Sequence, residues 1–569
     1  MKKRFLRMVA CVLCLCLLLS LSAVTAVGEE LPDISALYKN KDIDASWDKD
    51  ATVITLQGES ASASEDTFVT VSGNTVTITG KGDYVLTGLL QGQVVIAAGE
   101  EDKVHLILQG AEIVSPEGPA IYEKSCDKLI VTLAAGTENV LADTLDIQEG
   151  EDRIASALYA EDDLSINGSG TLEVFGNSGN GIQSKADLII AGGEITLQAA
   201  NDGIKGRNSV LVLGGTLNIT AENDGLVSSR KEKEDKGWIF IAGGEITIHT
   251  GSGAGEIKNI EAQGPWGRGR GGGWDWDDSG ENDTPSRKGI KAENGITVTD
   301  GTLVLDTEDD ALHSNSSLTI YGGTLSIRTG DDALHADEVT RIVGGEIDIA
   351  QCYEGIEGEK VEIAGGKISV VASDDGVNAA GGAQAETFGG WGRGGFDEAD
   401  HTNNLLLISG GLLEVTAGGD ALDSNGSIQM TGGVVGVFAT SSMGEGPIDY
   451  NGSGTQSGGT LIVATTGGSY GSSGAMQGLA TLAVSSISGA SGEEIQVLDG
   501  SGTVLGRFTP KSGFDSVLVS SDSLPEGTGV TVTVGGESVY AGQMQDNAAS
   551  YGDGFGQGGW GRQNRRRGW

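Results

Sequence analysis

The sequence predicts an all-β protein, a parallel β-helix built from short coils of roughly 21–22 residues each. A small residue followed by an aliphatic residue returns at this step wherever no insertion intervenes, with the aliphatic anchors at Ile182, Ile204, Leu226, Ile290, Leu312, Leu334, Ile356, Val377 and Leu422. Gly-Gly pairs keep the same step and lie between alternating aliphatic residues, as in LTIYGGTLSI. Alternation with period two indicates short strands, and such a short unit buries its apolar face only by stacking on its neighbours. Helical periodicity is nearly absent, and the LxxLxLxxN signature of a leucine-rich horseshoe is missing.

The start of the chain has the features of a secretory signal. Positions 1–26 combine a basic start, an apolar run and a small-residue ending. Their removal takes away four basic residues and changes the net charge from −44 to −48. This charge disfavours nucleic acid and anionic membranes as partners, and no later stretch is apolar enough to span a bilayer. We therefore expect a monomer that is secreted, extracellular or non-covalently associated with the cell surface.

The remaining chain divides by its periodicity. We expect an N-terminal β cap at 27–104 and the β-helix at 105–479. An antiparallel β unit should follow at 480–545, where the period of the repeat is lost and turn pairs such as Asp499-Gly500 appear. The Gly/Arg/Trp-rich tail at 546–569 is expected to be disordered.

Two Gly-rich inserts, near 259–287 and 381–403, interrupt the β-helix and carry Trp266 and Trp391. Exposed tryptophan beside arginine can stack on sugar rings. Segments of this composition are equally typical of linkers without a binding role.

A row of acidic residues precedes the anchors. Equivalent residues on adjacent coils should lie about 4.8 Å apart, so that their carboxylates repel each other. Solvent, protonation or a hard cation such as Ca²⁺, which accepts about six to eight oxygen ligands, could relieve this repulsion. A turn-forming role for Asp-Gly is the alternative, but a turn needs one aspartate where the chain often supplies two. The candidate calcium ligands are Asp202, Asp224, Asp309, Asp310, Asp331, Asp332, Glu354, Asp374, Asp375 and Asp420.

One position after the anchors lies a polar column that should point away from the core. Its members are Lys291, His313, His335, Glu357 and Asn378. A flat polar strip beside bound cations suits an extended sugar polymer, whereas a solvated face is the simpler interpretation. The stacked histidines could also hold zinc, although carboxylate-rich surroundings favour a harder ion.

Several runs resemble one known family. GPAIYEKSCDKLIVTLAAGTENVLAD, NDGIKGRNSVLVLGGTLNI, RKGIKAENGITV, GDDALHAD and YEGIEGEKVEIAGG, in this order, are similar to bacterial secreted carbohydrate-binding parallel β-helices. The resemblance implies a right-handed, calcium-bearing β-helix with the shape of a pectate lyase. It also implies binding to plant cell-wall polysaccharide such as polygalacturonate, without demonstrated catalysis.

Catalysis is the alternative function. β-Elimination of a polyuronate needs calcium and a lysine or arginine base, for which Lys291 and Lys205 are the candidates. We expect a calcium-dependent carbohydrate-binding protein for acidic polysaccharide. A calcium-dependent pectate lyase and a calcium-binding structural surface protein without a glycan ligand remain open.

Overall fold

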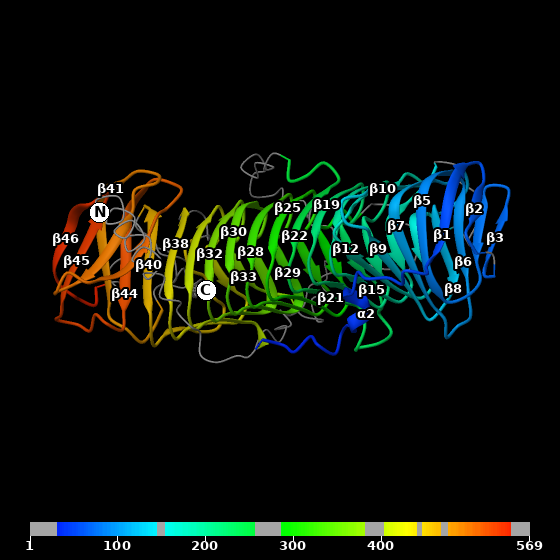
Figure 1. Ribbon diagram of the computed structural model, residues 1–569. Helices are drawn as coiled ribbons and strands as arrows, with labels where there is room; N and C mark the ends of the chain where they lie inside the picture. The colour runs from blue at the N-terminus through cyan, green and yellow to red at the C-terminus, as the bar shows by residue number, and fades with distance from the viewer. Residues whose placement is uncertain are drawn as a thin grey trace, which may run out of the picture.

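The computed structural model describes residues 31–65, 67–144, 154–255, 286–381, 403–440, 446–467 and 476–547. These residues are nearly all β-strand, and the one helix among them is the four-residue α2 (Asn40–Ile43). Figure 1 shows the strands stacked along one long axis, with β2 and β3 at one end and β45 and β46 at the other. No helix of the described residues is long and apolar enough to cross a membrane.

The strands form three parallel stacks, and most strands pair with the strand three places further along the chain. Each coil therefore adds one strand to every stack. The first stack carries the candidate site and contains β4 (Thr75–Ile78), β6 (Gln93–Ala97), β8 (Ile121–Ser125), β11 (Ser156–Ala160), β14 (Asn180–Ser184), β17 (Ile204–Gly206), β20 (Leu226–Ser228), β23 (Ile290–Ala292), β26 (Leu312–Ser314), β29 (Leu334–Ile342), β31 (Ile356–Ile363), β33 (Val377–Ala379) and β36 (Leu422–Ser424).

The longer strands β29 and β31 continue from the first stack into the second. The other strands of the second stack are β1 (Thr52–Gly58), β5 (Gly82–Gln91), β7 (Lys103–Val114), β9 (Lys128–Leu133), β12 (Asp163–Gly168), β15 (Asp187–Ile190), β18 (Ser209–Val212), β21 (Trp238–Ile241), β24 (Gly295–Val298), β27 (Ser317–Ile320), β34 (Leu405–Ile408), β37 (Ser427–Met430) and β39 (Gly454–Gln456).

The third stack starts from the end of β7. It contains β10 (Glu138–Ala142), β13 (Thr171–Gly176), β16 (Glu194–Ala199), β19 (Thr216–Ala221), β22 (Glu245–Thr250), β25 (Thr302–Thr307), β28 (Thr324–Thr329), β30 (Glu346–Cys352), β32 (Lys367–Ala372), β35 (Leu412–Ala417), β38 (Val434–Thr440) and β40 (Thr460–Thr466). The architecture is therefore a β-solenoid, as the sequence predicts, while its right-handed sense stays a prediction.

One apolar core runs through the coils. The anchors Leu312, Leu334 and Ile356 are fully buried, because each points inward from its short strand. The second glycine of each Gly-Gly pair turns the chain toward the third stack. Gly323, for example, has a φ of +93°, and a Cβ there would lie 2.9 Å from the carbonyl oxygen of Gly301 on the preceding coil. Both the backbone conformation and the close approach of the coils require glycine. Cys126 and Cys352 are free and buried.

Parallel pairing begins earlier than the predicted start of the β-helix. β1 pairs with β5, and β5 pairs with β7, all in parallel. Antiparallel pairs at this end join β2 (Ala61–Ala63) to β1 and β3 (Val69–Ser72) to β4. The residues predicted as a separate cap at 27–104 thus include parallel strands of the stack.

At the other end, β40 is followed by antiparallel pairing. β44 (Phe514–Ser521) pairs antiparallel with both β40 and β41 (Thr481–Gly489). A separate antiparallel sheet contains β42 (Ile495–Asp499), β43 (Val504–Phe508), β45 (Gly529–Val534) and β46 (Glu537–Gln543). It shares an apolar cluster with Phe438 and Ile462 of the third stack.

The N-terminal segment lies along the outside of the second stack, where Figure 1 shows α2 beside β12 and β15. Asp42 is buried and its carboxylate forms an ion pair with Lys128 Nζ at 2.5 Å. Ile34 and Tyr38 pack against an outward apolar cluster of Ile189, Leu211 and Phe240. This segment covers apolar side chains that would otherwise face solvent.

Candidate functional site

The candidate site follows the first stack, where each short strand begins at a buried anchor. The residue two positions before the anchor belongs to what we call the acidic row: Asn180, Asp202, Asp224, Lys288, Asp310, Asp332, Glu354, Asp375 and Asp420. The residue after the anchor belongs to the polar strip: Gln183, Lys205, Val227, Lys291, His313, His335, Glu357, Asn378 and Asp423. The structure thus brings most of the predicted site residues into two adjacent lines, and Asp309, Asp331 and Asp374 each lie one position before a member of the acidic row.

Side chains of the acidic row hold the backbone of the next coil. The backbone N–H of Asp332 donates to Asp310 Oδ1 at 3.1 Å, and the same contact joins Asn180 to Asp202, Asp224 to Lys288 and Asp375 to Asp420. One side-chain oxygen is therefore used to connect coils. The row therefore has a structural role whether or not it binds a cation, but this role joins neighbouring coils and differs from the turn-forming interpretation, in which Asp contacts its own turn.

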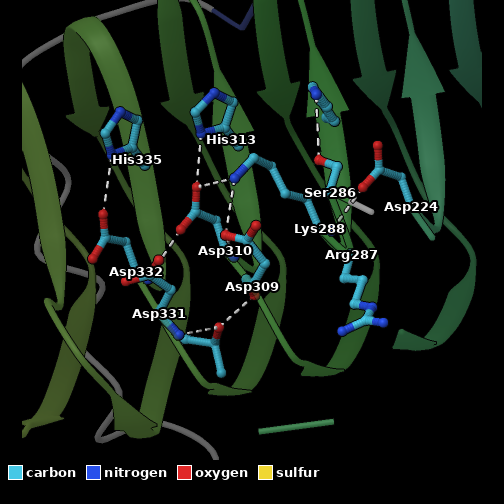
Figure 2. A network of polar contacts seen from close by, with 12 residues as sticks. Asp224, Ser286, Arg287, Lys288, Asp309, Asp310, His313, Asp331, Asp332 and His335 are labelled. Carbon is cyan, nitrogen blue, oxygen red and sulfur yellow. Dashed lines mark hydrogen bonds and ion pairs between the residues drawn. The ribbon is translucent and has the colours of Figure 1, made fainter. Parts of the chain in front are cut away.

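Lys288 interrupts the row of acidic residues. It occupies the row position between Asp224 and Asp310, and its side chain is only 9% exposed. Its Nζ donates to Asp309 Oδ1 and to Asp310 Oδ2 at 2.9 Å each (Figure 2). Burial opposes its charge, but Asp310 and Asp309 raise the pKa of Lys288. A lysine thus supplies part of the charge compensation that we expected from a metal ion.

The histidines of the polar strip point back toward the acidic row, as Figure 2 shows. Their rings stack with centroids 4.7 Å apart. His313 Nδ1 lies 2.8 Å from Asp310 Oδ2, and His335 Nδ1 lies 3.1 Å from Asp332 Oδ2. Both side chains are largely covered, with 14% and 20% of their surface exposed. The strip is therefore less exposed at this point than strand alternation predicts.

Beyond Lys288 the negative charge is concentrated. Burial, followed by repulsion from Asp310 and Asp309, raises the pKa of Asp331 to about 7. Burial and the neighbouring Glu357 raise the pKa of Glu354 to about 9. Burial likewise raises the pKa of Asp332 well above its ordinary value. Each of these raised pKa values indicates a carboxylate whose negative charge is not fully compensated by its surroundings.

A pocket of about 560 Å³ lies on the N-terminal side of Lys288. Lys205 and Lys291, both candidate bases, line it from strands β17 and β23, and Val227 of β20 lies between them in the strip. Lys205 Nζ forms an ion pair with Asp202 Oδ2 at 2.8 Å, while Lys291 Nζ donates to Ser286 Oγ at 3.3 Å.

Asp202 and Asp224 also line this pocket and are almost fully buried. Burial raises the pKa of Asp224, and the positive charge of Lys291 partly offsets that effect. The pocket therefore combines two ammonium groups with two carboxylates. Both carboxylates belong to the predicted calcium ligands.

Two all-oxygen groups remain. In one, carboxylate oxygens of Asp309, Asp310 and Asp331 lie within 4.8 Å of one another. In the other, carboxylate oxygens of Asp420, Asp423 and Asp449 also lie within 4.8 Å of one another. Sequence reasoning missed Asp449, because Ile448 pairs with Leu422 after a longer step that departs from the repeat. It also missed Asp423, although this residue follows the anchor Leu422 and pairs with Asn378 in the regular stack.

Among the other predicted residues, the structure describes Asp374 and Asp375. Asp374 lies beside the hydroxyl of Tyr353, and burial together with Asp374 raises the pKa of that tyrosine. Asp375 contacts the backbone of Asp420, as described above. Trp266 and Trp391 lie outside the described residues, so their predicted role in binding stays a prediction.

Comparison with known proteins relates the chain to carbohydrate binding. Residues 72–333 match the family model described as carbohydrate-binding domain-containing protein. A curated relative with the same description, from Acetivibrio thermocellus, is 37% identical over 150 residues, which are 26% of this chain and 52% of the relative. The chain thus spans about half the length of this relative.

One similar solved structure is described as the gadolinium derivative of a polysaccharide lyase-like protein from C. thermocellum. It is 26% identical, and the match covers 51% of this chain and 96% of that chain with a TM-score of 0.38. The family match includes Lys205 and Lys291 but ends before His335 and Asp420.

Proposed function

We propose that this protein binds carbohydrate and that its ligand is an acidic polysaccharide such as polygalacturonate. The observation that carries the proposal is the pocket between Lys205 and Lys291. An ammonium group recognises a carboxylate by a charge-assisted hydrogen bond, and a uronate presents one carboxylate on each sugar. The match of residues 72–333 to a carbohydrate-binding family supports the same ligand class.

Lys291 is the better placed of the two lysines for this contact. Among the described residues it forms no ion pair, and its ammonium group donates only the long hydrogen bond to Ser286. Lys205 already pairs with Asp202 and can share its charge with a second carboxylate. We assign the uronate carboxylate to Lys291, with Lys205 as the neighbouring contact.

The proposal includes calcium, because a chain with a net charge of −44 repels a polyanion over about 8 Å at physiological ionic strength. Asp420, Asp423 and Asp449 offer only oxygen ligands and fit a hard cation. The Asp309, Asp310 and Asp331 group fits less well, since the ammonium group of Lys288 already contacts two of its members. Calcium bound at this row would supply positive charge beside the polar strip.

Binding of polygalacturonate to the wild type and to two variants tests the function. We expect Lys291→Ala to weaken binding at least tenfold and Lys205→Ala to weaken it less. Lys367→Ala is the matched control, because Lys367 is an exposed lysine of the third stack and its loss changes the net charge equally. Equal affinities of the Lys291 and Lys367 variants would place the binding surface elsewhere, and absence of glycan binding in the wild type would favour a structural surface protein.

A calcium-dependent lyase is the second candidate, because both candidate bases line one pocket with Asp202 and Asp224. Lys205 is held in an ion pair that favours its charged form, and the binding role assigned to Lys291 needs a charged ammonium group, whereas a general base must be uncharged. We therefore expect no release of unsaturated uronides from polygalacturonate with calcium present. A steady increase of ultraviolet absorbance that Lys291→Ala abolishes would assign the chain to the lyases instead.

A further inference from the structure

We propose that His335 is the central ligand of a binding site for a divalent transition-metal ion, together with Asp332 and Glu357. This site is distinct from the sugar-binding pocket and from the all-oxygen groups assigned to calcium. It does not rest on the proposed carbohydrate ligand, since it follows from the contacts that Asp332, His335 of β29 and Glu357 of β31 make with one another.

The three ligand atoms already converge on one point. His335 Nδ1 lies 2.7 Å from Glu357 Oε2 and 3.1 Å from Asp332 Oδ2. All three atoms lie within 4.8 Å of one another. Metal–ligand bonds of about 2.0–2.2 Å require neighbouring ligand atoms to lie a few tenths of an ångström farther apart than these contacts do. Small rotations of the three side chains would supply that space.

The second ring nitrogen of His335 is held as it is in many metal sites. His335 Nε2 lies 3.3 Å from Asp337 Oδ1 on the side of the ring away from the converging atoms. A carboxylate in this position accepts the Nε2 proton, so Nδ1, which faces Asp332 and Glu357, is the ring nitrogen at which a metal ion would replace a proton. Histidine ligands of metals commonly have such a carboxylate behind the ring.

The local charges leave room for a cation. Asp332, Glu357 and Asp337 contact His335, and Glu354 adds negative charge near Asp332, whereas the neighbouring carboxylates Asp309 and Asp310 have the ammonium group of Lys288. No lysine or arginine forms an ion pair with Asp332, Glu354 or Glu357 among the described residues. A divalent ion would compensate this charge as Lys288 does one coil earlier.

An independent observation comes from Asn378, which follows Glu357 in the polar strip. Its side chain is only 8% exposed, and its Nδ2 donates to Glu354 Oε2 at 2.9 Å. Its amide oxygen is buried and accepts no hydrogen bond from the described residues. A buried oxygen without a donor is costly, and a bound cation or its coordinated water would satisfy it.

The ligand types indicate the class of metal. Calcium is bound by oxygen, whereas zinc and other late first-row ions accept imidazole nitrogen together with carboxylates. One imidazole with two carboxylates is a known type of zinc donor set. The site should therefore prefer Zn²⁺ to Ca²⁺.

Equilibrium dialysis with Zn²⁺ in millimolar Ca²⁺ tests the site on the metal-stripped full chain. We expect one zinc ion per chain in the wild type, with affinity at least a hundredfold lower in His335→Ala and Glu357→Gln. Asp337→Asn should lower the affinity for zinc by about 10- to 100-fold, because Asp337 orients the ring without touching the metal. His249→Ala is the matched control, since His249 lies beside Asp306 in the third stack.

Cobalt provides a second readout on the same variants. Co²⁺ bound by His335 should give visible d–d absorption that Zn²⁺ abolishes and that His335→Ala lacks. The proposal is wrong if zinc does not bind, if the His335 and His249 variants bind it equally, or if millimolar calcium displaces it. Should His335→Ala fail to fold, Asp337→Asn provides the same comparison, and none of these outcomes depends on whether the chain binds glycan.

Discussion

At the scale of single residues, a carboxylate of the acidic row can make two kinds of contact at once. Asp310 Oδ1 accepts the backbone N–H of Asp332, while its Oδ2 contacts Lys288 and His313. Burial opposes ionisation, but Lys288 and His313 hold the pKa of Asp310 well below its usual range. The side chain is therefore charged in the folded protein and depends on its cationic partners.

Lys288→Ala should destabilise the protein strongly. It removes one partner of a buried ion pair and leaves Asp310, which is 4% exposed, with His313 alone. Such a loss costs about 3–5 kcal/mol of unfolding free energy. Urea unfolding measures the change, and Lys367→Ala in the exposed pair with Glu346 should cost less than about 1 kcal/mol. A cost below about 1 kcal/mol for Lys288→Ala would show that the pair contributes little.

Glu123→Gln should change how stability depends on pH. Glu123 is fully buried, and burial raises its pKa from 4.5 to about 7. Between these pH values the folded protein keeps a proton that the unfolded chain has released, so the free energy of unfolding falls as pH rises. The loss reaches at most about 3 kcal/mol. Unfolding at pH 4.5, 6 and 8 should show a steeper decline in the wild type than in the variant, in which Asp331 and Glu354 still contribute; parallel profiles would contradict it.

The sequence was sufficient to predict the neighbours that the repeat creates. His313 and His335 occupy the same position in consecutive repeats, and their pairing in β26 and β29 follows from that period. The role of Lys288 was missed although the anchor Ile290 fixes its position in the repeat, because the repeat does not indicate that a lysine there reaches Asp309 and Asp310. The pair of Asp42 and Lys128 could not be predicted, since a contact between an irregular segment and a strand leaves no periodic signal.

At the scale of elements, the N-terminal segment is held by a few specific contacts. Asp42 accepts hydrogen bonds from Lys128 Nζ and Ser165 Oγ, and Asn167 Nδ2 donates to the backbone oxygen of Asp42. Lys128 is only 9% exposed, so its charge depends on this carboxylate. The segment is therefore joined to the second stack through Asp42, in addition to the apolar contacts of Ile34 and Tyr38.

Asp42→Ala should release the segment without unfolding the stack. The variant leaves a buried ammonium group unpaired, which weakens the attachment by about 3–5 kcal/mol. Limited proteolysis should cut before Thr52 at least tenfold faster than in the wild type, while the melting of the remaining protein changes little. Asp33→Ala is the control, because Asp33 is exposed and contacts only Ser35 among the described residues. Equal cleavage rates would mean that the apolar contacts of Ile34 and Tyr38 are sufficient.

At the scale of the whole molecule, acidic residues exceed basic residues by 44, and several acidic groups meet along one stack. Each coil contacts mainly its neighbours, so repulsion within one group is relieved locally or not at all. The three parallel stacks and the apolar core were predictable, because period and burial pattern repeat at every coil. The positions of the charge-compensating groups could not be predicted from the repeat, because they depend on single residues.

Calcium should raise the melting temperature of the full chain. An ion that binds only the folded state at a hundred times its dissociation constant adds about 2.7 kcal/mol. Asp420→Asn should reduce this response, because Asp420 belongs to the all-oxygen group with Asp423 and Asp449. Scanning calorimetry in millimolar calcium and in excess chelator measures the shift, and identical melting curves would exclude a structural calcium site.

The contact between a row carboxylate and the backbone of the next coil has an evolutionary consequence. Because Asp310 connects coils through one oxygen, selection for a stable stack alone would retain it after any ligand had been lost. Conserved aspartates among related chains would therefore trace descent of the architecture. Within the described residues, no such contact with the backbone of a neighbouring coil is made by the side chains of Lys205, Lys291 and His335. The gain and loss of these three residues among relatives would therefore be the better record of changing ligands.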